Sequence, residues 1–319
     1  MTRNGKAVRN KREWRFTRMK ITDREITHSD LEQVSEFLGK GIGYSDRYFL
    51  QLLQRMTEHP TPEGFPKYGR VLICDGAIVG AIVLIFSTVQ SDGIPSVRCH
   101  VTGWCVEPAY RGYAALFFGK DLRHRNVTYV NISAQWTADT LPIIATQGFT
   151  RYCSGQFVAV PALRFAPADS QVKVVTADHT PKVPFETFDK DLLSAHAKYG
   201  CICVWCVTAE RAYPFVFRPR FFKRTIPGVQ LVYCRDIEHF TRFAGPIGRF
   251  LALRGRLVVR IDSNAPIEGL IGKFMENADS RFYKGSKPRL GDLAYTHLAM
   301  CAYVPRKKKS SSKALQRGL

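Results

Sequence analysis

The first part of the chain carries two stretches in which hydrophobic residues recur at helical spacing. They predict helices over Leu31–Leu38 and Tyr48–Met56. Ser29 and Glu32 have the spacing of a capping box, so we expect Ser29 to cap the first helix. Ahead of both helices, Lys20–Glu25 fits a short strand. The pattern therefore predicts one strand and two helices before the main sheet begins.

A β-hairpin is the clearest feature of the next segment. Tyr68–Cys74 and Ala77–Ser87 flank Asp75-Gly76, a dipeptide that accepts the positive φ values of a tight turn. A strand, a helix, a strand, a short helix and a strand are predicted to follow, over Val97–Val106, Ala114–His124, Thr128–Ala134, Thr140–Thr146 and Gln156–Val160. This order of elements is typical of a mixed α/β fold.

Residues 161–180 have the turn-rich composition of a connector, with a candidate strand at Gln171–Val175. A similar order of elements is predicted beyond it. A helix, three strands, a helix, a strand, a short helix and a last strand are expected over Phe185–Lys198, Cys201–Thr208, Tyr213–Phe217, Val229–Cys234, Ile237–Leu253, Leu257–Ile261, Ile267–Glu276 and Leu293–Tyr303. The recurring order indicates two related domains.

A short echo supports a duplication. Arg151–Gly155 and Arg281–Gly285 each begin with arginine and an aromatic residue and each end in glycine. Two unrelated arginine-aromatic turns would give the same echo. We expect domains at 20–165 and 180–304, between basic flexible tails at 1–19 and 305–319.

Composition and charge narrow the classes of function. The chain is 45% hydrophobic and 12% aromatic, which is typical of a folded protein. It has no apolar run of the roughly 18 to 20 residues that span a bilayer and no secretory signal, so we expect a cytoplasmic protein. Residues 1–20 and 305–319 carry 13 of the 20 net positive charges. Weak contact of these tails with a polyanion such as RNA, or with an anionic membrane surface, stays open.

The nine cysteines do not indicate a disulfide framework, because they are odd in number and lie mostly in apolar runs. Cys201, Cys203 and Cys206 alternate as in a strand, and no second pair follows at zinc-site spacing. We therefore expect free thiols and no metal.

The turn after Val106 has the composition of a phosphate-binding corner. A helix N-terminus with small residues lets several main-chain N–H groups converge on a diphosphate. Here a strand, a turn containing Arg111-Gly112 and a helix starting at Ala114 follow one another. A plain strand-to-helix turn is the alternative interpretation.

This corner resembles the motif of the GNAT superfamily of acyl-CoA-dependent N-acyltransferases, Val-x-Pro-x-x-Arg-Gly-x-Gly/Ala between a strand and a helix. The matching residues are Val106, Pro108, Arg111, Gly112 and Ala114. The resemblance covers about residues 20–160 and extends more loosely, through the order of elements, over 180–304. It implies an α/β fold in GNAT style, with tandem domains that each contain a mixed, mostly antiparallel sheet flanked by helices.

The resemblance also implies a reaction and a cofactor site. An acyl group, with acetyl expected, would pass from acyl-CoA to an amine of a small molecule or protein. The residues implied to hold the acyl-CoA are Cys105, Val106, Arg111, Gly112, Tyr113, Ala114, Ala115 and Leu116. Leu116 is bulkier than the family pattern, and Ile144 stands where many members have a tyrosine that protonates the leaving thiolate. These departures favour a non-catalytic acyl-CoA-binding or partner-binding protein as a rival hypothesis.

Two side chains are candidates for acid–base chemistry. Alternation along the strand predicts one face with His100, Thr102, Trp104 and Val106, and the other with Cys99, Val101, Gly103 and Cys105. His100 is the candidate base, although a hydrogen-bonded core histidine fits the same position. Tyr152 is an alternative acid, with aromatic packing as its competing role. Cys105 and Cys153 are expected to be inert thiols.

The second domain lacks a counterpart of the Arg111 turn. Cys234-Arg235-Asp236 passes directly into the helix predicted over Ile237–Leu253, in which Gly245 and Gly248 are better explained by helix packing or by a kink near Pro246. We therefore expect a degenerate copy that shapes the acceptor site or stabilises the first domain.

Overall fold

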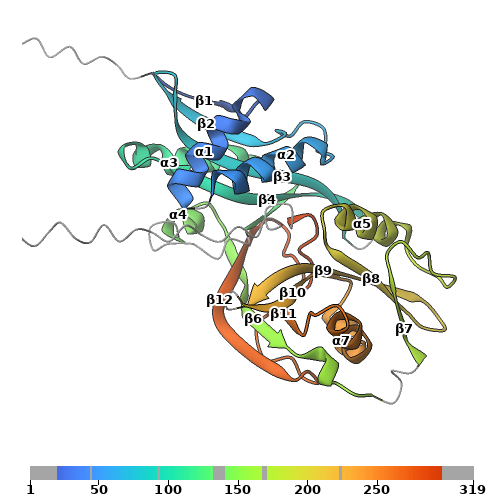
Figure 1. The fold of residues 1–319 in the computed structure, drawn as a ribbon. Helices are drawn as coiled ribbons and strands as arrows, with labels where there is room; N and C mark the ends of the chain where they lie inside the picture. Colours follow the sequence, from blue (N-terminus) through green and yellow to red (C-terminus); the bar gives the residue numbers. More distant parts are fainter. Residues whose placement is uncertain are drawn as a thin grey trace, which may run out of the picture.

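The computed structural model of the chain describes residues 20–43, 45–91, 94–131, 141–166, 171–222 and 225–296. Within these ranges twelve strands form one sheet, in the order β1-β2-β3-β4-β5-β12-β6-β11-β10-β9-β8-β7 (Figure 1). The mixed α/β class is confirmed. The two separate sheets that we expected are joined into one.

The first half follows the predicted order of elements. Its strands are β1 (Ile21–Glu25), β2 (Gly69–Cys74), β3 (Ala77–Ser91), β4 (Ile94–Val106), β5 (Val127–Asn131) and β6 (Thr150–Ala159). Its helices are α1 (Leu31–Ile42), α2 (Asp46–Glu58), α3 (Ala114–Lys120) and α4 (Leu141–Thr146), with short 3-10 turns at His28–Asp30, Pro108–Tyr113, Asp121–Arg123 and Pro161–Leu163. In the predicted hairpin turn, φ is 48° at Asp75 and 87° at Gly76, which confirms the turn.

The predicted cap of the first helix is wrong. The capping box joins Thr27 and Asp30, and the Thr27 N–H donates to Asp30 Oδ2 at 2.8 Å. Arg24 also donates to both carboxylate oxygens of Asp30, at 2.6 and 2.8 Å. This pair holds Asp30 in the capping position, and the predicted pair of Ser29 and Glu32 plays no part in it.

Helices cover both faces of the first half of the sheet. Apolar residues of α1 and α2 pack with Val71, Ala81 and Val83 on one face. Residues of α3 and α4 pack with Leu84 and Phe86, among others, on the opposite face. Each face of β3 is therefore buried, as expected for a central strand that is hydrophobic along its length.

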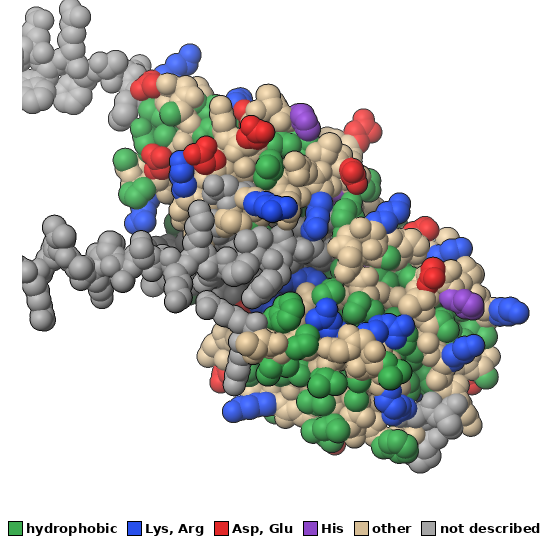
Figure 2. All heavy atoms as spheres, viewed as in Figure 1, with side chains coloured by type: hydrophobic (Ala, Val, Ile, Leu, Met, Phe, Trp, Pro, Cys, Tyr) green, Lys and Arg blue, Asp and Glu red, His purple; other side chains and the backbone are tan. Residues whose placement is uncertain are grey.

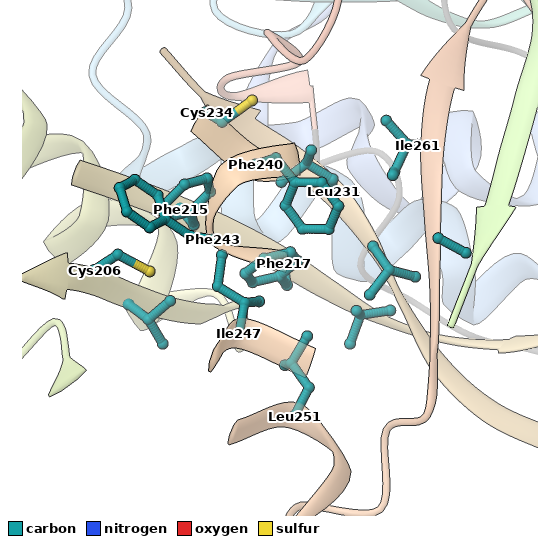
Figure 3. Close-up of a cluster of buried hydrophobic side chains, with 14 of the residues drawn as sticks. Cys206, Phe215, Phe217, Leu231, Cys234, Phe240, Phe243, Ile247, Leu251 and Ile261 are labelled. Carbon is teal, nitrogen blue, oxygen red and sulfur yellow. The ribbon is translucent and has the colours of Figure 1, made fainter. Parts of the chain in front are cut away.

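The second half contains the strands β7 (Lys173–Thr176), β8 (Ile202–Val207), β9 (Ala212–Phe222), β10 (Ile226–Cys234), β11 (Val258–Ser263) and β12 (Gly272–Lys284). Its helices are α5 (Thr187–Lys198), α6 (Ile237–Arg242) and α7 (Ala244–Ala252). Phe240, Phe243 and Ile247 of the α6–α7 segment cover Phe215 and Phe217 of β9 (Figure 3). The predicted helix over Ile237–Leu253 is thus two helices that break at Phe243, and Pro246 lies in the first turn of α7, where a missing N–H is tolerated.

One prediction for the C-terminal part is wrong, and another lies mostly outside the described residues. The helix expected over Ile267–Glu276 is not formed: its first half is irregular, and its second half begins strand β12, where pairing with β6 overrides a hydrophobic spacing that also fits a helix. The strand expected over Leu293–Tyr303 begins, in the described residues, as turns, with one bridge between Tyr233 and Asp292. The rest of that segment lies outside the described residues.

Strand β12 joins the halves. Its last residues pair with β5, and most of its length pairs with β6. The two echoed segments lie side by side in this ladder, with Arg281 opposite Cys153 and Phe282 opposite Arg151. The domain limits that we expected, and the duplication, stay predictions.

No helix among the described residues is long and apolar enough to cross a bilayer. On the face seen in Figure 2, Lys and Arg side chains are interspersed with exposed hydrophobic side chains over the second half. Both predicted basic tails lie outside the described residues.

Candidate active site

Strands β4 and β5 run parallel and then separate. Their pairing starts at Val97 with Val127 and ends at His100 with Val130. Beyond His100, the described residues pair β4 with β3 alone, up to Val106. Among the described residues, β4 beyond His100 therefore has no neighbour on the side of β5, and the end of the β4–β5 pair is open there.

A bulge at Gly103 shapes this opening. Gly103 has φ of 57°, and a Cβ there would lie 3.1 Å from Phe49 and 3.3 Å from Val83. The register of β4 against β3 shifts at this point. The shift corrects the predicted alternation, because Trp104 and Val106 pack in the same cluster as Cys99 and Val101.

The turn after β4 is exposed at the head of α3. Arg111 and Gly112 are exposed, and a Cβ on Gly112 would meet nothing within 4 Å. Tyr113 is 45% exposed, and Leu116, at 68%, directs its bulk away from the core. The corner is thus not covered by other described side chains.

The main-chain amides of this turn are partly engaged. The Tyr110 N–H donates to Glu107 O at 2.9 Å, and the Ala114 N–H donates to Arg111 O. Such i to i−3 bonds define the 3-10 turn over Pro108–Tyr113. A diphosphate must displace some of these bonds to reach the amides.

A groove of about 500 Å³ runs along α3 from this corner. Ala115 and Leu116 line one part of it, together with Gly119. Its other part is basic, with Arg123, His124, Arg125 and Lys284 in the lining. The groove therefore offers positive charge next to two of the residues predicted to hold the acyl-CoA.

His100 lies at the last paired position of β4 and is 3% exposed. Its Nδ1 is 3.1 Å from Val130 O. Burial lowers the pKa of His100 to about 3, and the nearby Arg281 adds to this effect. The ring is therefore neutral at neutral pH and shielded from solvent, and its role as a base stays a prediction.

Tyr152 is 5% exposed and packs edge to face against Tyr283, with 5.7 Å between ring centroids. Burial raises the pKa of Tyr152 far above its ordinary value, so the hydroxyl stays protonated. It lines a second pocket, at the end of β10, whose lining contains none of the residues predicted to hold acyl-CoA. Its role as an acid stays a prediction.

The thiols have weak nucleophilic character. Burial raises the pKa of Cys105, and the carboxylate of Glu107 raises it further. Burial also raises the pKa of Cys153 to about 11. Cys203 and Cys206 pack in different hydrophobic clusters, so they do not share one site. Ile144 is a core residue, 1% exposed.

The structure contains two buried ion pairs that we did not predict from the sequence. Arg98 of β4 donates to both oxygens of Asp292, at 3.0 and 2.9 Å. Arg281 of β12 donates to Asp262 of β11, from Nε at 2.9 Å. A charged residue within an apolar strand, such as Arg98 between Val97 and Cys99, was the signal available in the sequence, because such a charge requires a buried partner.

The second half contains a similar parallel pair that is closed. Strands β10 and β11 pair from Gly228 to Gln230, and then separate. The segment Gly291–Leu293 fills the gap: the Leu293 N–H donates to Val232 O at 2.7 Å, and the Cys234 N–H donates to Gly291 O at 2.9 Å. This end is sealed by main-chain hydrogen bonds.

No known family model and no curated protein matches the sequence. Solved structures do match. A putative acetyltransferase from Pyrococcus horikoshii has a TM-score of 0.53 at 13% identity, over 86% of this chain and 92% of that one. A GCN5-related N-acetyltransferase from Kribbella flavida has a TM-score of 0.51 at 12% identity, over 83% and 71%. A probable N-acyltransferase from Enterococcus faecalis has a TM-score of 0.52 at 10% identity, over 86% and 73%. The fold is that of the GCN5-related N-acetyltransferases.

Proposed function

We propose that the protein is an acyl-CoA-dependent N-acyltransferase that moves an acyl group, acetyl in the first instance, to an amine. The observation that carries the proposal is the end of the β4–β5 pair, which the described residues leave open, followed directly by the exposed Arg111-Gly112 turn and α3. This arrangement can hold a phosphorylated carrier at the turn and lead its acyl arm along the strand.

The parts of the cofactor are assigned to separate residues. The main chain of Cys105 and Val106 borders the opening and would bind the pantetheine arm. The Arg111 side chain and the main chain from Gly112 to Leu116 would bind the diphosphate, with the exposed Leu116 side chain turned outward. The basic lining of the α3 groove supplies further charge that suits the phosphates.

Binding is proposed to open the 3-10 turn. The amides of Tyr110 and Ala114 are bonded to carbonyls within the turn, so their exchange for phosphate oxygens requires a local rearrangement. Gly112 has open space around it and allows close approach of the main chain. Leu116 and the buried Ile144 depart from the family pattern and favour a second candidate function, a protein that binds acyl-CoA or a partner without turnover.

For catalysis, His100 is the proposed base. With a pKa of about 3 its buried ring is a weak proton acceptor, so this role requires that acceptor binding bring water or the amine to the ring and raise its pKa toward neutrality. A further proposal is that the second half is a diverged copy of the first, whose closed strand pair no longer binds a carrier.

Titration calorimetry of the full chain with acetyl-CoA and longer acyl-CoAs tests the proposal. Arg111→Glu should weaken binding by about tenfold or more, since a charge-assisted contact is replaced by repulsion. Lys182→Glu, at an exposed position of the second half, is the control and should bind as the wild type does. Absence of binding to every acyl-CoA would remove the proposal.

Turnover assays with wild-type protein and His100→Ala then separate the two candidate functions. Binding without turnover by the wild type would establish the non-catalytic alternative. Unchanged turnover in His100→Ala would remove the proposed base.

A further inference from the structure

A second pocket, of about 360 Å³, lies at the closed end of the β10–β11 pair. Its wall is built from β6, the corner between β10 and α6, the residue after β11 and the segment after β12. The lining residues are Tyr152, Arg235, Asp236, Ile237, Asn264, Lys287, Pro288, Arg289 and Leu290. Four segments of the chain thus converge around one small space.

Positive charge dominates this lining. Arg235, Lys287 and Arg289 face one carboxylate, that of Asp236. Asp236 is already engaged, because its Oδ1 accepts the Glu238 N–H at 2.9 Å as the cap of α6. The pocket wall therefore contains three positive side chains and one negative side chain, so its net charge is positive.

Two of the cations are held in place by contacts outside the pocket. Arg235 donates from Nε to Asp189 at 2.7 Å, a bond that leaves the terminal nitrogens of its guanidinium for other partners. Arg289 lies over the Tyr233 ring, 5.4 Å from its centroid, and its guanidinium is 3.9 Å from Asp292. Guanidiniums fixed in this way lose little side-chain freedom on binding a ligand.

Tyr152 supplies an independent observation. Its hydroxyl is buried and has no hydrogen-bond partner among the described residues. A buried hydroxyl without a partner is costly and calls for an explanation. Asn264, also in the pocket wall, donates to Tyr152 O at 3.0 Å and fixes the main chain of Tyr152. A ligand oxygen that accepts from the Tyr152 O–H would satisfy this donor.

We infer that this pocket binds a small ligand through a phosphate or carboxylate group, held by Arg235, Arg289, Lys287 and the O–H of Tyr152. Anionic oxygens are the acceptors that guanidinium, ammonium and phenol groups share. The site is separate from the proposed acyl-CoA site and does not depend on it.

Titration calorimetry of the full chain at low salt, with inorganic phosphate in one arm and succinate in the other, tests this inference. Saturable one-to-one binding of either probe is expected, and the tighter probe identifies the preferred group. Absence of binding in both arms overturns the inference, whatever the result with acyl-CoA.

Tyr152→Phe separates ligand binding from folding. Because the hydroxyl has no partner to lose, the variant should unfold at the same temperature as the wild type or higher when no probe is present. Its affinity for the probe should fall by about tenfold, as expected for a lost hydrogen bond to a charged group. Equal affinity in wild type and variant would exclude Tyr152 from the site and contradict the inference.

Two further variants guard against a general effect of charge. Lys287→Ala removes an exposed cation of the pocket and should weaken binding. Lys182→Ala removes an exposed cation that lines neither of the two described pockets and should leave binding unchanged. Equal weakening by Lys182→Ala and Lys287→Ala would show a general effect of charge and overturn the inference.

Discussion

Each half of the molecule contains a pair of parallel strands joined by a helical crossover, and the two pairs end differently. The β4–β5 pair stops at His100, and the β10–β11 pair stops at Gln230. Both residues are polar and buried. Beyond Gln230 the segment Gly291–Leu293 returns to fill the gap, whereas the described residues leave the end beyond His100 open. The same arrangement of parallel strands thus ends either in an opening or in a sealed junction. The difference is whether a later segment of the chain pairs with the end of the strand.

The sealed end is tied to the strand that borders the open end. Arg98 belongs to β4, two residues before His100, and its partner Asp292 lies in the filling segment. Arg98 holds the pKa of Asp292 at about 2 despite burial. The pair therefore links the two halves of the described chain through a buried contact.

Loss of Asp292 is the most severe way to break this arrangement. Asp292→Ala leaves the Arg98 guanidinium buried without a carboxylate, so the free energy of unfolding should fall by about 3 to 5 kcal/mol. Urea denaturation followed by circular dichroism measures the change.

Two controls accompany this measurement. Glu36→Ala removes an exposed pair with Lys40 and should have little effect. The double variant Arg98→Leu with Asp292→Leu removes both charges and should recover much of the loss. An effect of Asp292→Ala no larger than that of Glu36→Ala would mean that the ion pair does not join the halves.

A smaller change in the free energy of unfolding is expected when acid protonates His100 at the open end. Burial places the pKa of His100 in the folded protein at about 3, below the ordinary value of 6.5. As the pH falls, His100 is therefore protonated in the unfolded chain before it is protonated in the folded protein. The stability associated with His100 is complete above about pH 6.5 and is lost progressively between about pH 6.5 and about pH 3.

His100→Gln installs the residue that the closed pair has at this position. The loss of unfolding free energy between about pH 7 and about pH 5 should be smaller by about 2 kcal/mol in this variant than in the wild type. Other buried histidines are common to both proteins, so the comparison cancels their effect. Parallel pH profiles for the two proteins would show that His100 is not held neutral by burial.

Local signals in the sequence explain which elements could be predicted. Asp75-Gly76 between two apolar runs determines the hairpin, and the helical spacing in α1 and α2 determines those helices. Strand β12 could not be found in this way, because its partners β5 and β6 lie more than a hundred residues earlier in the chain. Its local pattern fits a helix equally well.

The candidate sites also combine features that neighbouring residues determine with features that depend on residues far apart in the sequence. The turn at Arg111-Gly112 follows from a strand, a turn and a helix that are adjacent in sequence. The hydrogen bonds that occupy its amides depend on backbone geometry, which residue types do not specify. The pocket at Tyr152 was missed because residues from position 152 to position 290 must meet to form it.

Two glycines give the finest test of the contrast between the open and the closed corner. Gly291, in the filling segment, has φ of 77°, and a Cβ there would lie 2.8 Å from Cys234 Sγ and 2.9 Å from Ile237 Cδ1. Gly291→Ala should therefore lower the free energy of unfolding by about 1 to 2 kcal/mol.

Gly112 is the matched position at the open corner, where a Cβ would meet nothing within 4 Å. Gly112→Ala should leave the free energy of unfolding unchanged or raise it by up to about 1 kcal/mol, because alanine restricts the unfolded chain. In calorimetry, the same variant should weaken acyl-CoA binding, since the added methyl group stands where the main chain must approach the diphosphate. Destabilisation by Gly112→Ala equal to that by Gly291→Ala would mean that the corner after β4 is filled in solution, and the contrast between the two halves would then be lost.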